Sequence, residues 1–129
     1  LLRRFDAKIS FNRYTKADLI DISVSILQSY IKKVSTSKVD IRLFKKILNN
    51  MENVPYPGEM VQLIKISLAF ADESNEYDYL RRFYLELHGN QKPNINELTE
   101  QGYTTREIEI ITHIPKSSVS RRLKGNKDE

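Results

Sequence analysis

The sequence predicts an all-α protein, and three observations support that prediction. Apolar residues recur three and four positions apart through most of the chain, which is the spacing of one helix face. Residues that favour the first position of a helix, such as Thr15 and Asn94, stand just before these segments. Proline and glycine fall mainly between the segments, most densely at 53–58. We expect an N-terminal bundle of about four helices followed by a trihelical C-terminal lobe.

Length and composition are those of a globular protein. The 129 residues are 40% hydrophobic and 29% charged, with 21 basic and 17 acidic side chains. We expect two lobes, residues 1–89 and 90–129. The absence of cysteine excludes disulfides and thiolate metal sites. No apolar run approaches the ~20 residues of a membrane span and no secretory signal peptide is present, so we expect a cytoplasmic protein that contacts no membrane.

The first helix is expected at 15–34. Thr15 and Asp18 have the spacing of a capping box, in which each side chain bonds the other residue's amide. Its apolar residues form one stripe, and so do those of the next expected helix, at 40–51. These stripes indicate core packing, and we see no cofactor-binding pattern in them.

The second half of the N-terminal lobe is expected to begin after a loop at 53–58, because two prolines and a glycine interrupt a helix there. A helix is expected at 59–70. The acidic segment 72–76 lacks the glycine and the regular spacing of a calcium loop, so we expect a solvated turn. The last helix of the lobe is expected at 77–88. Its aromatic and arginine side chains allow stacking on single-stranded bases as an alternative to core packing.

The C-terminal lobe is expected to follow a hinge at 89–93, where a glycine and a proline bracket polar residues. Asn94 and Glu97 have the spacing of a cap before a short helix at 95–101. The apolar residues of this helix are expected to pack on the two helices that follow.

Two further short helices are expected after it. Thr104 or Thr105 can cap the first, and Glu107 stands where a capping-box carboxylate belongs. The helix should break at 112–115, because proline disfavours a helical residue before it and fits the first turn of a new helix.

The last helix is expected at 116–124. Val119 and Leu123 stand four residues apart and should point back to the preceding helix, while Gly125 ends the segment. We expect no winged hairpin after it.

This pair of helices has the pattern of a helix-turn-helix, whose second helix enters the major groove of DNA. From Ile110 to Lys127 there is no acidic residue, which suits the phosphates that dominate affinity for DNA. Serine and arginine side chains on an exposed face are suited to reading base edges. We expect DNA contacts from Lys116, Ser117, Ser118, Ser120, Arg121, Arg122 and Lys124.

Residues 102–123 resemble, without a gap, the helix-turn-helix of the resolvase/invertase recombinases. The resemblance implies base contacts by a serine early in the second helix and an arginine four residues later, which correspond to Ser117 and Arg121. Two positions depart from the family. Glu109 replaces a usually small residue and must lean outward, and His113 stands where glycine is frequent, so it must accept the backbone of the turn. The resemblance implies a mode of DNA binding and no recombinase chemistry.

The sequence offers no constellation for catalysis. It has no phosphate-binding glycine loop, no His-Glu-x-x-His pattern and no serine in a nucleophile-elbow context. His88 and His113 are isolated in the sequence, so no metal pair is expected. We therefore expect no catalytic residue, no cofactor, no metal and no enzyme activity from this chain alone.

Two functions from different classes follow. The first is a DNA-binding module whose C-terminal lobe reads sequence, while the N-terminal lobe positions it, dimerises it or couples it to another domain. Its context is a transcriptional regulator or the accessory domain of a replication or mobile-element protein such as a plasmid primase. The chain opens with Leu1 and lacks an initiator methionine, which favours a piece of a larger protein.

The alternative is a helical protein-interaction domain with no nucleic-acid role. A protein-binding hairpin has no need for an outer face free of acids at 116–124, which favours the first function. The expected partners are DNA and either another domain of the parent protein or a second copy of this chain.

Overall fold

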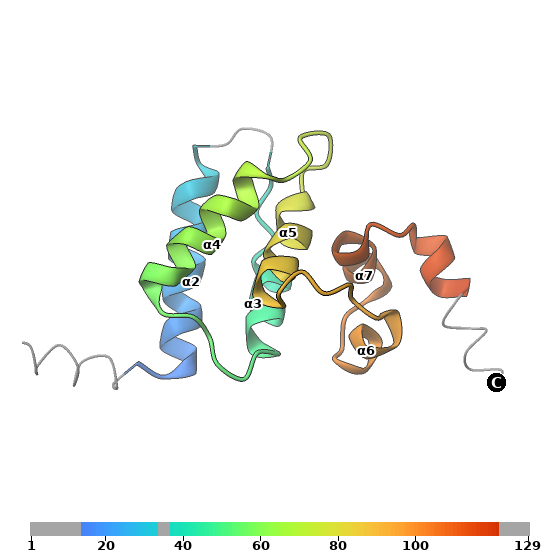
Figure 1. The fold of residues 1–129 in the computed structure, drawn as a ribbon, viewed down its shortest axis with the longest axis horizontal. Coiled ribbons are helices and arrows are strands. Elements are labelled where there is room, and N and C mark those ends of the chain that lie inside the picture. Colours follow the sequence, from blue (N-terminus) through green and yellow to red (C-terminus); the bar gives the residue numbers. More distant parts are fainter. Residues whose placement is uncertain (1–13, 34–36, 122–129) are drawn as a thin grey trace, which may run out of the picture.

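The computed structural model describes residues 14–33 and 37–121, and every regular element in these ranges is a helix (Figure 1). The all-α fold class is therefore confirmed for that part of the chain. The labelled helices are α2 (Lys16–Ile31), α3 (Ile41–Asn49), α4 (Pro57–Ala69), α5 (Asp78–Leu87), α6 (Ile95–Glu100) and α7 (Thr105–Thr112). Residues 116–121 are also helical. Among the residues described, no helix is long and apolar enough to cross a bilayer.

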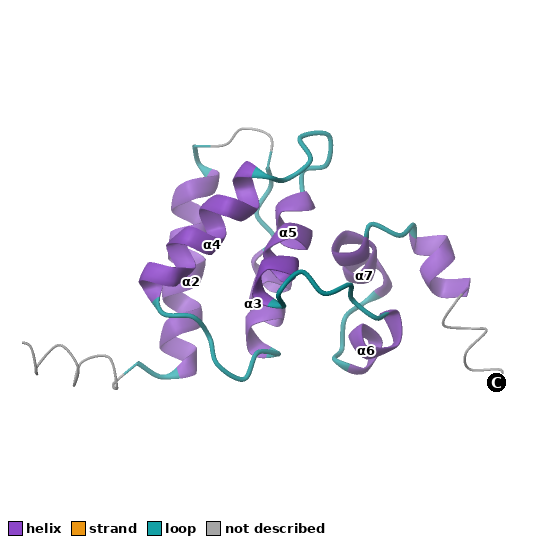
Figure 2. Ribbon diagram, viewed as in Figure 1, coloured by secondary structure: helices purple, strands orange, loops and turns teal. Residues whose placement is uncertain are grey.

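Helix α5 lies at the centre of the molecule and joins its two halves. Helix α2 packs on α3 and α4, while α5 packs on α3, α4 and α7, and α6 packs on α7. The short loops between the helices leave residues 116–121 at the opposite end of the molecule from α2 and α4 (Figure 2). One cluster of buried hydrophobic residues has members from both expected lobes. The predicted division at 89/90 therefore crosses a continuous core.

Helices α2 and α3 each begin at a residue whose side chain caps the helix. Thr15 Oγ1 accepts a hydrogen bond from the Asp18 amide at 3.0 Å, and Asp18 Oδ2 accepts one from the Thr15 amide at 3.1 Å, which confirms the predicted capping box. Asp40 Oδ1 accepts from the Leu43 amide at 3.1 Å and starts α3 in the same way. Helix α2 ends at Ile31, before the predicted end at 34, which lies outside the described residues.

Helix α4 begins at Pro57, so the prediction that 53–58 is entirely loop was wrong for its last two residues. Proline fits the first helical position because its fixed φ is already helical and the missing amide would have no partner there. The carbonyl of Tyr56 accepts the Met60 amide at 2.9 Å and closes the first turn. The sequence correctly indicated that proline and glycine interrupt a helix here, but it did not place Pro57 and Gly58 in the first turn of α4.

The segment 72–76 forms a turn before α5, as predicted. Asp72 Oδ1 accepts hydrogen bonds from the Ser74 amide at 2.9 Å and the Ser74 hydroxyl at 2.7 Å. The Ser74 hydroxyl and amide hold the pKa of the Asp72 carboxyl below its ordinary value. Asn75 Oδ1 accepts the Tyr77 amide at 3.0 Å, which leads the chain into α5.

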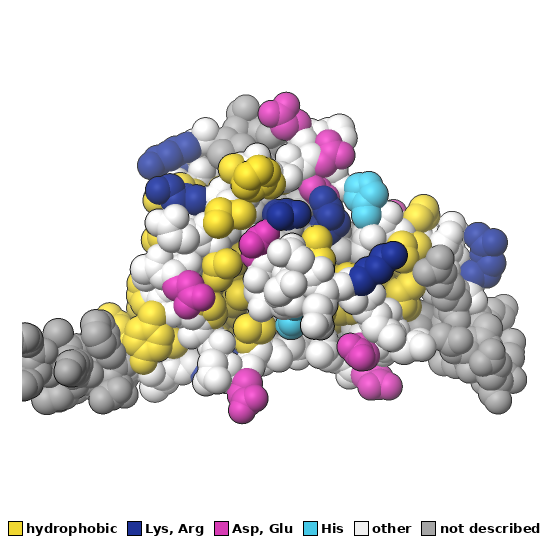
Figure 3. Space-filling view, in the orientation of Figure 1, with side chains coloured by type: hydrophobic (Ala, Val, Ile, Leu, Met, Phe, Trp, Pro, Cys, Tyr) yellow, Lys and Arg dark blue, Asp and Glu magenta, His cyan; other side chains and the backbone are white. Residues whose placement is uncertain are grey.

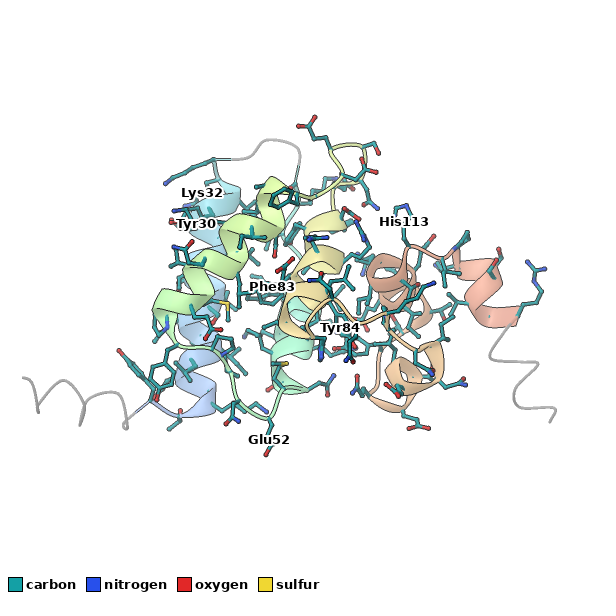
Figure 4. The ribbon with its side chains drawn as sticks, in the orientation of Figure 1. Tyr30, Lys32, Glu52, Phe83, Tyr84 and His113 are labelled. Atoms are coloured by element: carbon teal, nitrogen blue, oxygen red, sulfur yellow. The ribbon has the colours of Figure 1, made fainter. Side chains whose placement is uncertain are left out.

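Most aromatic side chains of α5 lie in the core. Tyr79, Phe83 and Tyr84 are buried, so stacking of these three on single-stranded bases is excluded. Tyr77, the fourth aromatic of that alternative, is half-buried. Phe83 packs on Phe44 of α3, with ring centroids 4.9 Å apart. Figure 4 shows Phe83 on the side of α5 that faces α3, and Tyr84 on the side that faces α6. Burial raises the pKa of Tyr79, whose hydroxyl donates to the Lys38 carbonyl at 2.7 Å.

Candidate nucleic-acid interface

Helix α7 begins at a second capping box. Thr104 Oγ1 accepts from the Glu107 amide at 3.2 Å, and Glu107 Oε1 accepts from the Thr104 amide at 2.8 Å. The sequence left Thr104 and Thr105 as alternatives, and the structure selects Thr104. The cap fixes where α7 starts and therefore which of its residues face the core.

A left-handed residue ends α7. His113 has φ 65° and ψ 21°, a conformation that costs a side-chain-bearing residue about 1–2 kcal/mol. Its amide donates to the Glu109 carbonyl at 2.8 Å, and Thr112 Oγ1 accepts from the Ile114 amide at 3.2 Å. His113 thus takes the backbone expected where the recombinase pattern often has glycine. These bonds turn the chain sharply before Pro115.

The next helical segment starts from Pro115. Its carbonyl accepts the amides of Ser118 at 2.9 Å and Val119 at 3.0 Å, which closes the first turn of residues 116–121. Val119 is 0% exposed and belongs to the hydrophobic core, as predicted. The segment is therefore held against the rest of the protein through one buried side chain.

The predicted contact residues divide into three groups. Lys116, Ser117, Ser120 and Arg121 are exposed, and their spacing places them along one face of the helix. Ser118 is half-buried at the edge of that face. Arg122 and Lys124 lie outside the described residues, as does Leu123. The structure brings four of the seven residues together on one exposed surface.

Two ion pairs fix α7 to the N-terminal bundle, and sequence reasoning missed both. Lys46 Nζ of α3 lies 2.6 Å from Glu107 Oε1 and donates to the Gly102 carbonyl at 3.1 Å. Arg106 pairs with Asp40 at 3.1 Å, and its guanidinium lies over the Tyr77 ring, 5.2 Å from the centroid. Both pairs join residues about sixty positions apart, which no local pattern encodes.

A buried carboxylate, Asp78, lies near the turn at His113. Asp78 is fully buried and accepts hydrogen bonds from Arg81 at 2.7 and 3.0 Å and from the Asp72 amide at 2.7 Å. Burial raises the pKa of Asp78, but these hydrogen bonds and the charges of Arg81 and His113 lower it further than burial raises it. His113 Nδ1 lies 3.9 Å from Asp78 Oδ1. Figure 4 shows His113 at the end of α7 that faces the loop before α5.

Two surface hollows border the turn at 113–115. The Lys92 hollow is lined by residues 92–96 together with Thr112 and Ile114. The His113 hollow consists of two adjoining pockets that share Asn75, Tyr77 and His113. Residues 72–77 and His113 line one of them, and the other is lined by Asn75, Tyr77, Arg106, Glu109, Ile110, His113 and Pro115. Glu109 therefore borders open space, as expected of a residue that leans outward. The two hollows differ in charge, since only the His113 hollow contains carboxylates.

No cluster of three or more potential metal ligands occurs within residues 14–33 and 37–121. Comparison with protein-family models gives no match, and neither the curated proteins nor the solved structures contain a significantly similar chain.

Proposed function

We propose that this chain is a DNA-binding module that reads duplex sequence through a helix-turn-helix at residues 105–121. One observation carries the proposal. A capped helix, a left-handed turn at His113 and a second helix anchored by Val119 follow one another, and the second helix presents serine and arginine to solvent. This order is the one that the sequence resemblance to the recombinase helix-turn-helix leads us to expect.

The chemistry of the exposed face supports the same function. Lys116 and Arg121 supply positive charge for phosphates, and arginine can donate two hydrogen bonds to a guanine edge. Ser117 and Ser120 present short hydroxyls that either donate or accept. No acidic residue occurs between Ile110 and Arg121 to repel DNA along this segment.

The N-terminal bundle is proposed to hold the reading helix in a fixed orientation. The Lys46–Glu107 and Asp40–Arg106 pairs tie the start of α7 to α3, so the helix-turn-helix has a defined position on the bundle. This arrangement suits either a transcriptional regulator or the accessory domain of a replication or mobile-element protein, and the proposal covers both.

The proposal is tested by fluorescence-anisotropy titration of random duplex and single-stranded DNA at two salt concentrations. The wild type is compared with Arg121→Ala and with Arg42→Ala, which removes an exposed arginine from α3. We expect salt-sensitive binding that weakens more with Arg121→Ala than with the control. Absence of binding to both forms at low salt would refute the proposal.

A second candidate is a protein-interaction domain, favoured by one observation. Phe70 at the end of α4 is 67% exposed, more than any other large hydrophobic residue among those described. Single exposed apolar residues are common on soluble proteins, so this observation is weaker than the charge and order of the turn segment. Unchanged DNA binding by Arg121→Ala would shift the assignment toward this function.

A further inference from the structure

We infer that the phosphate backbone of bound duplex DNA crosses the Lys92 hollow and avoids the His113 hollow. The inference rests on the proposed function and adds the side from which DNA approaches. In a helix-turn-helix the first residues of the second helix contact base edges, so a phosphate strand must pass close to the turn that precedes them. The two hollows border that turn and share no lining residue, and their charges differ.

The Lys92 hollow suits a phosphate. Lys92 is exposed and forms no ion pair within the described part of the chain. The other lining groups are amides, a hydroxyl and apolar side chains, with no carboxylate among them. Thr112 and Ile114 of the lining belong to the end of α7 and the turn, so a phosphate here would lie beside the turn that precedes the reading helix. A lysine with no ion-pair partner, beside amide and hydroxyl groups, is suited to a phosphate contact.

The His113 hollow opposes a phosphate. Asp72, Glu73 and Glu76 line one of its two pockets, and Glu109 lines the other. Glu76 is paired with Lys38 at 3.4 Å, so Asp72, Glu73 and Glu109 supply most of the negative charge. Glu73 is exposed and has no ion pair within the described residues. Arg106 also lines this hollow, but Asp40 neutralises its charge. Figure 3 shows acidic side chains gathered over the loop between α4 and α5, and a basic side chain over the last helical segment.

The loop that carries these carboxylates has a defined position. The Asp72 amide donates to the buried Asp78 at 2.7 Å, and the Lys38 amide donates to the Glu76 carbonyl at 3.0 Å. These bonds anchor both ends of the segment 72–76 to neighbouring elements. Its charges therefore stay beside His113, which lines the same pocket, and salt should screen their effect on a phosphate.

The test compares four single variants of the full chain that change charge by one unit. Lys92→Gln and Glu73→Gln alter the two hollows. Lys65→Gln on α4 and Glu52→Gln after α3 are the matched controls, since both residues are exposed and belong to the N-terminal bundle. Figure 4 shows Glu52 at the end of the bundle away from the loop before α5. Thermal midpoints equal to that of the wild type for all four variants would show that the fold is unchanged. The affinity for a random duplex is then measured over a series of salt concentrations.

We expect Lys92→Gln to weaken binding about three- to tenfold at low salt and to lower the salt slope by about one, as for one lost phosphate contact. Glu73→Gln should strengthen binding about two- to threefold at low salt, and the gain should vanish at high salt. Each control should change affinity by less than its partner. If Lys92→Gln or Glu73→Gln matches its control, the inference is overturned. If Arg121→Ala still loses binding in that case, the proposed function stands.

Discussion

Burial changes abruptly between neighbouring residues of the last helical segment. Val119 is fully buried, whereas Ser120 is exposed on the face proposed to read DNA. A new carboxylate at the first position would lie unpaired in the core, whereas at the second it would lie in solvent. Substitutions at residue 119 should therefore affect folding, whereas substitutions at the neighbouring residue 120 should affect binding.

Val119→Asp should unfold the C-terminal half, at a cost of about 3–5 kcal/mol, because an uncompensated charge would enter the core. Ser120→Asp should keep the thermal midpoint within a few degrees and weaken DNA binding through repulsion. Thermal unfolding by circular dichroism and DNA titration measure the two effects. A stable Val119→Asp protein would show that residue 119 is not packed as described.

The buried Asp78 should make stability depend on acid pH. Its pKa is lowered in the folded state, so the carboxylate favours folding above the unfolded pKa of ~3.9, and this contribution is lost as the pH falls toward the lowered folded value. Asp78→Asn should cost about 1–3 kcal/mol at pH 7. Wild-type stability should then fall more steeply than that of the variant below about pH 4.

The measurement is the urea midpoint between pH 7 and pH 2.5, with Asp21→Asn on the exposed face of α2 as the control. If the urea midpoints of the wild type and Asp78→Asn fell in parallel with pH, the lowered pKa of Asp78 in the folded protein would be contradicted.

Helix α7 is attached to α3 by contacts that are distant in sequence. Its capping box was predictable, because Thr104 and Glu107 are neighbours with a known spacing. Its attachment to α3 was not, because Lys46 and Asp40 gain their roles only after folding brings α3 to α7. Helix existence and caps follow from local rules, whereas ion pairs across the core follow from the three-dimensional arrangement.

The Lys46–Glu107 pair should contribute measurably to stability. Both side chains are largely buried, at 23% and 5% exposed, so solvent screens the pair weakly. A double-mutant cycle with Lys46→Met and Glu107→Gln should give a coupling of about 1–2 kcal/mol. The same cycle on the exposed Lys38–Glu76 pair should give below ~1 kcal/mol. Equal coupling energies for the two pairs would contradict a specific contribution of the Lys46–Glu107 pair to the attachment of α7.

At the scale of the whole molecule, the sequence predicted the all-α class and the order of helices. It predicted an outer face made of Ser117, Ser118, Ser120, Arg121 and Lys124 from helical spacing. Ser117, Ser120 and Arg121 are exposed, Ser118 is half-buried, and Lys124 lies outside the described residues. It treated 89–93 as a hinge, and it could not show that the two halves share one core, because the contacts of α5 with α7 join distant segments. The acidic segment 72–76 was predicted as a turn. Its position near His113 was not predictable, because it depends on how α5 packs.

The most direct test of the central claim is the ratio of affinities for a selected duplex and a random duplex. The selected sequence comes from repeated binding and amplification of a random pool with the wild-type chain. Arg121→Ala should reduce the ratio by a factor corresponding to ~1–3 kcal/mol, because a base contact is lost. Lys92→Gln and Lys124→Ala should weaken both duplexes alike and leave the ratio unchanged. Equal loss on both duplexes for Arg121→Ala would contradict sequence reading by this helix.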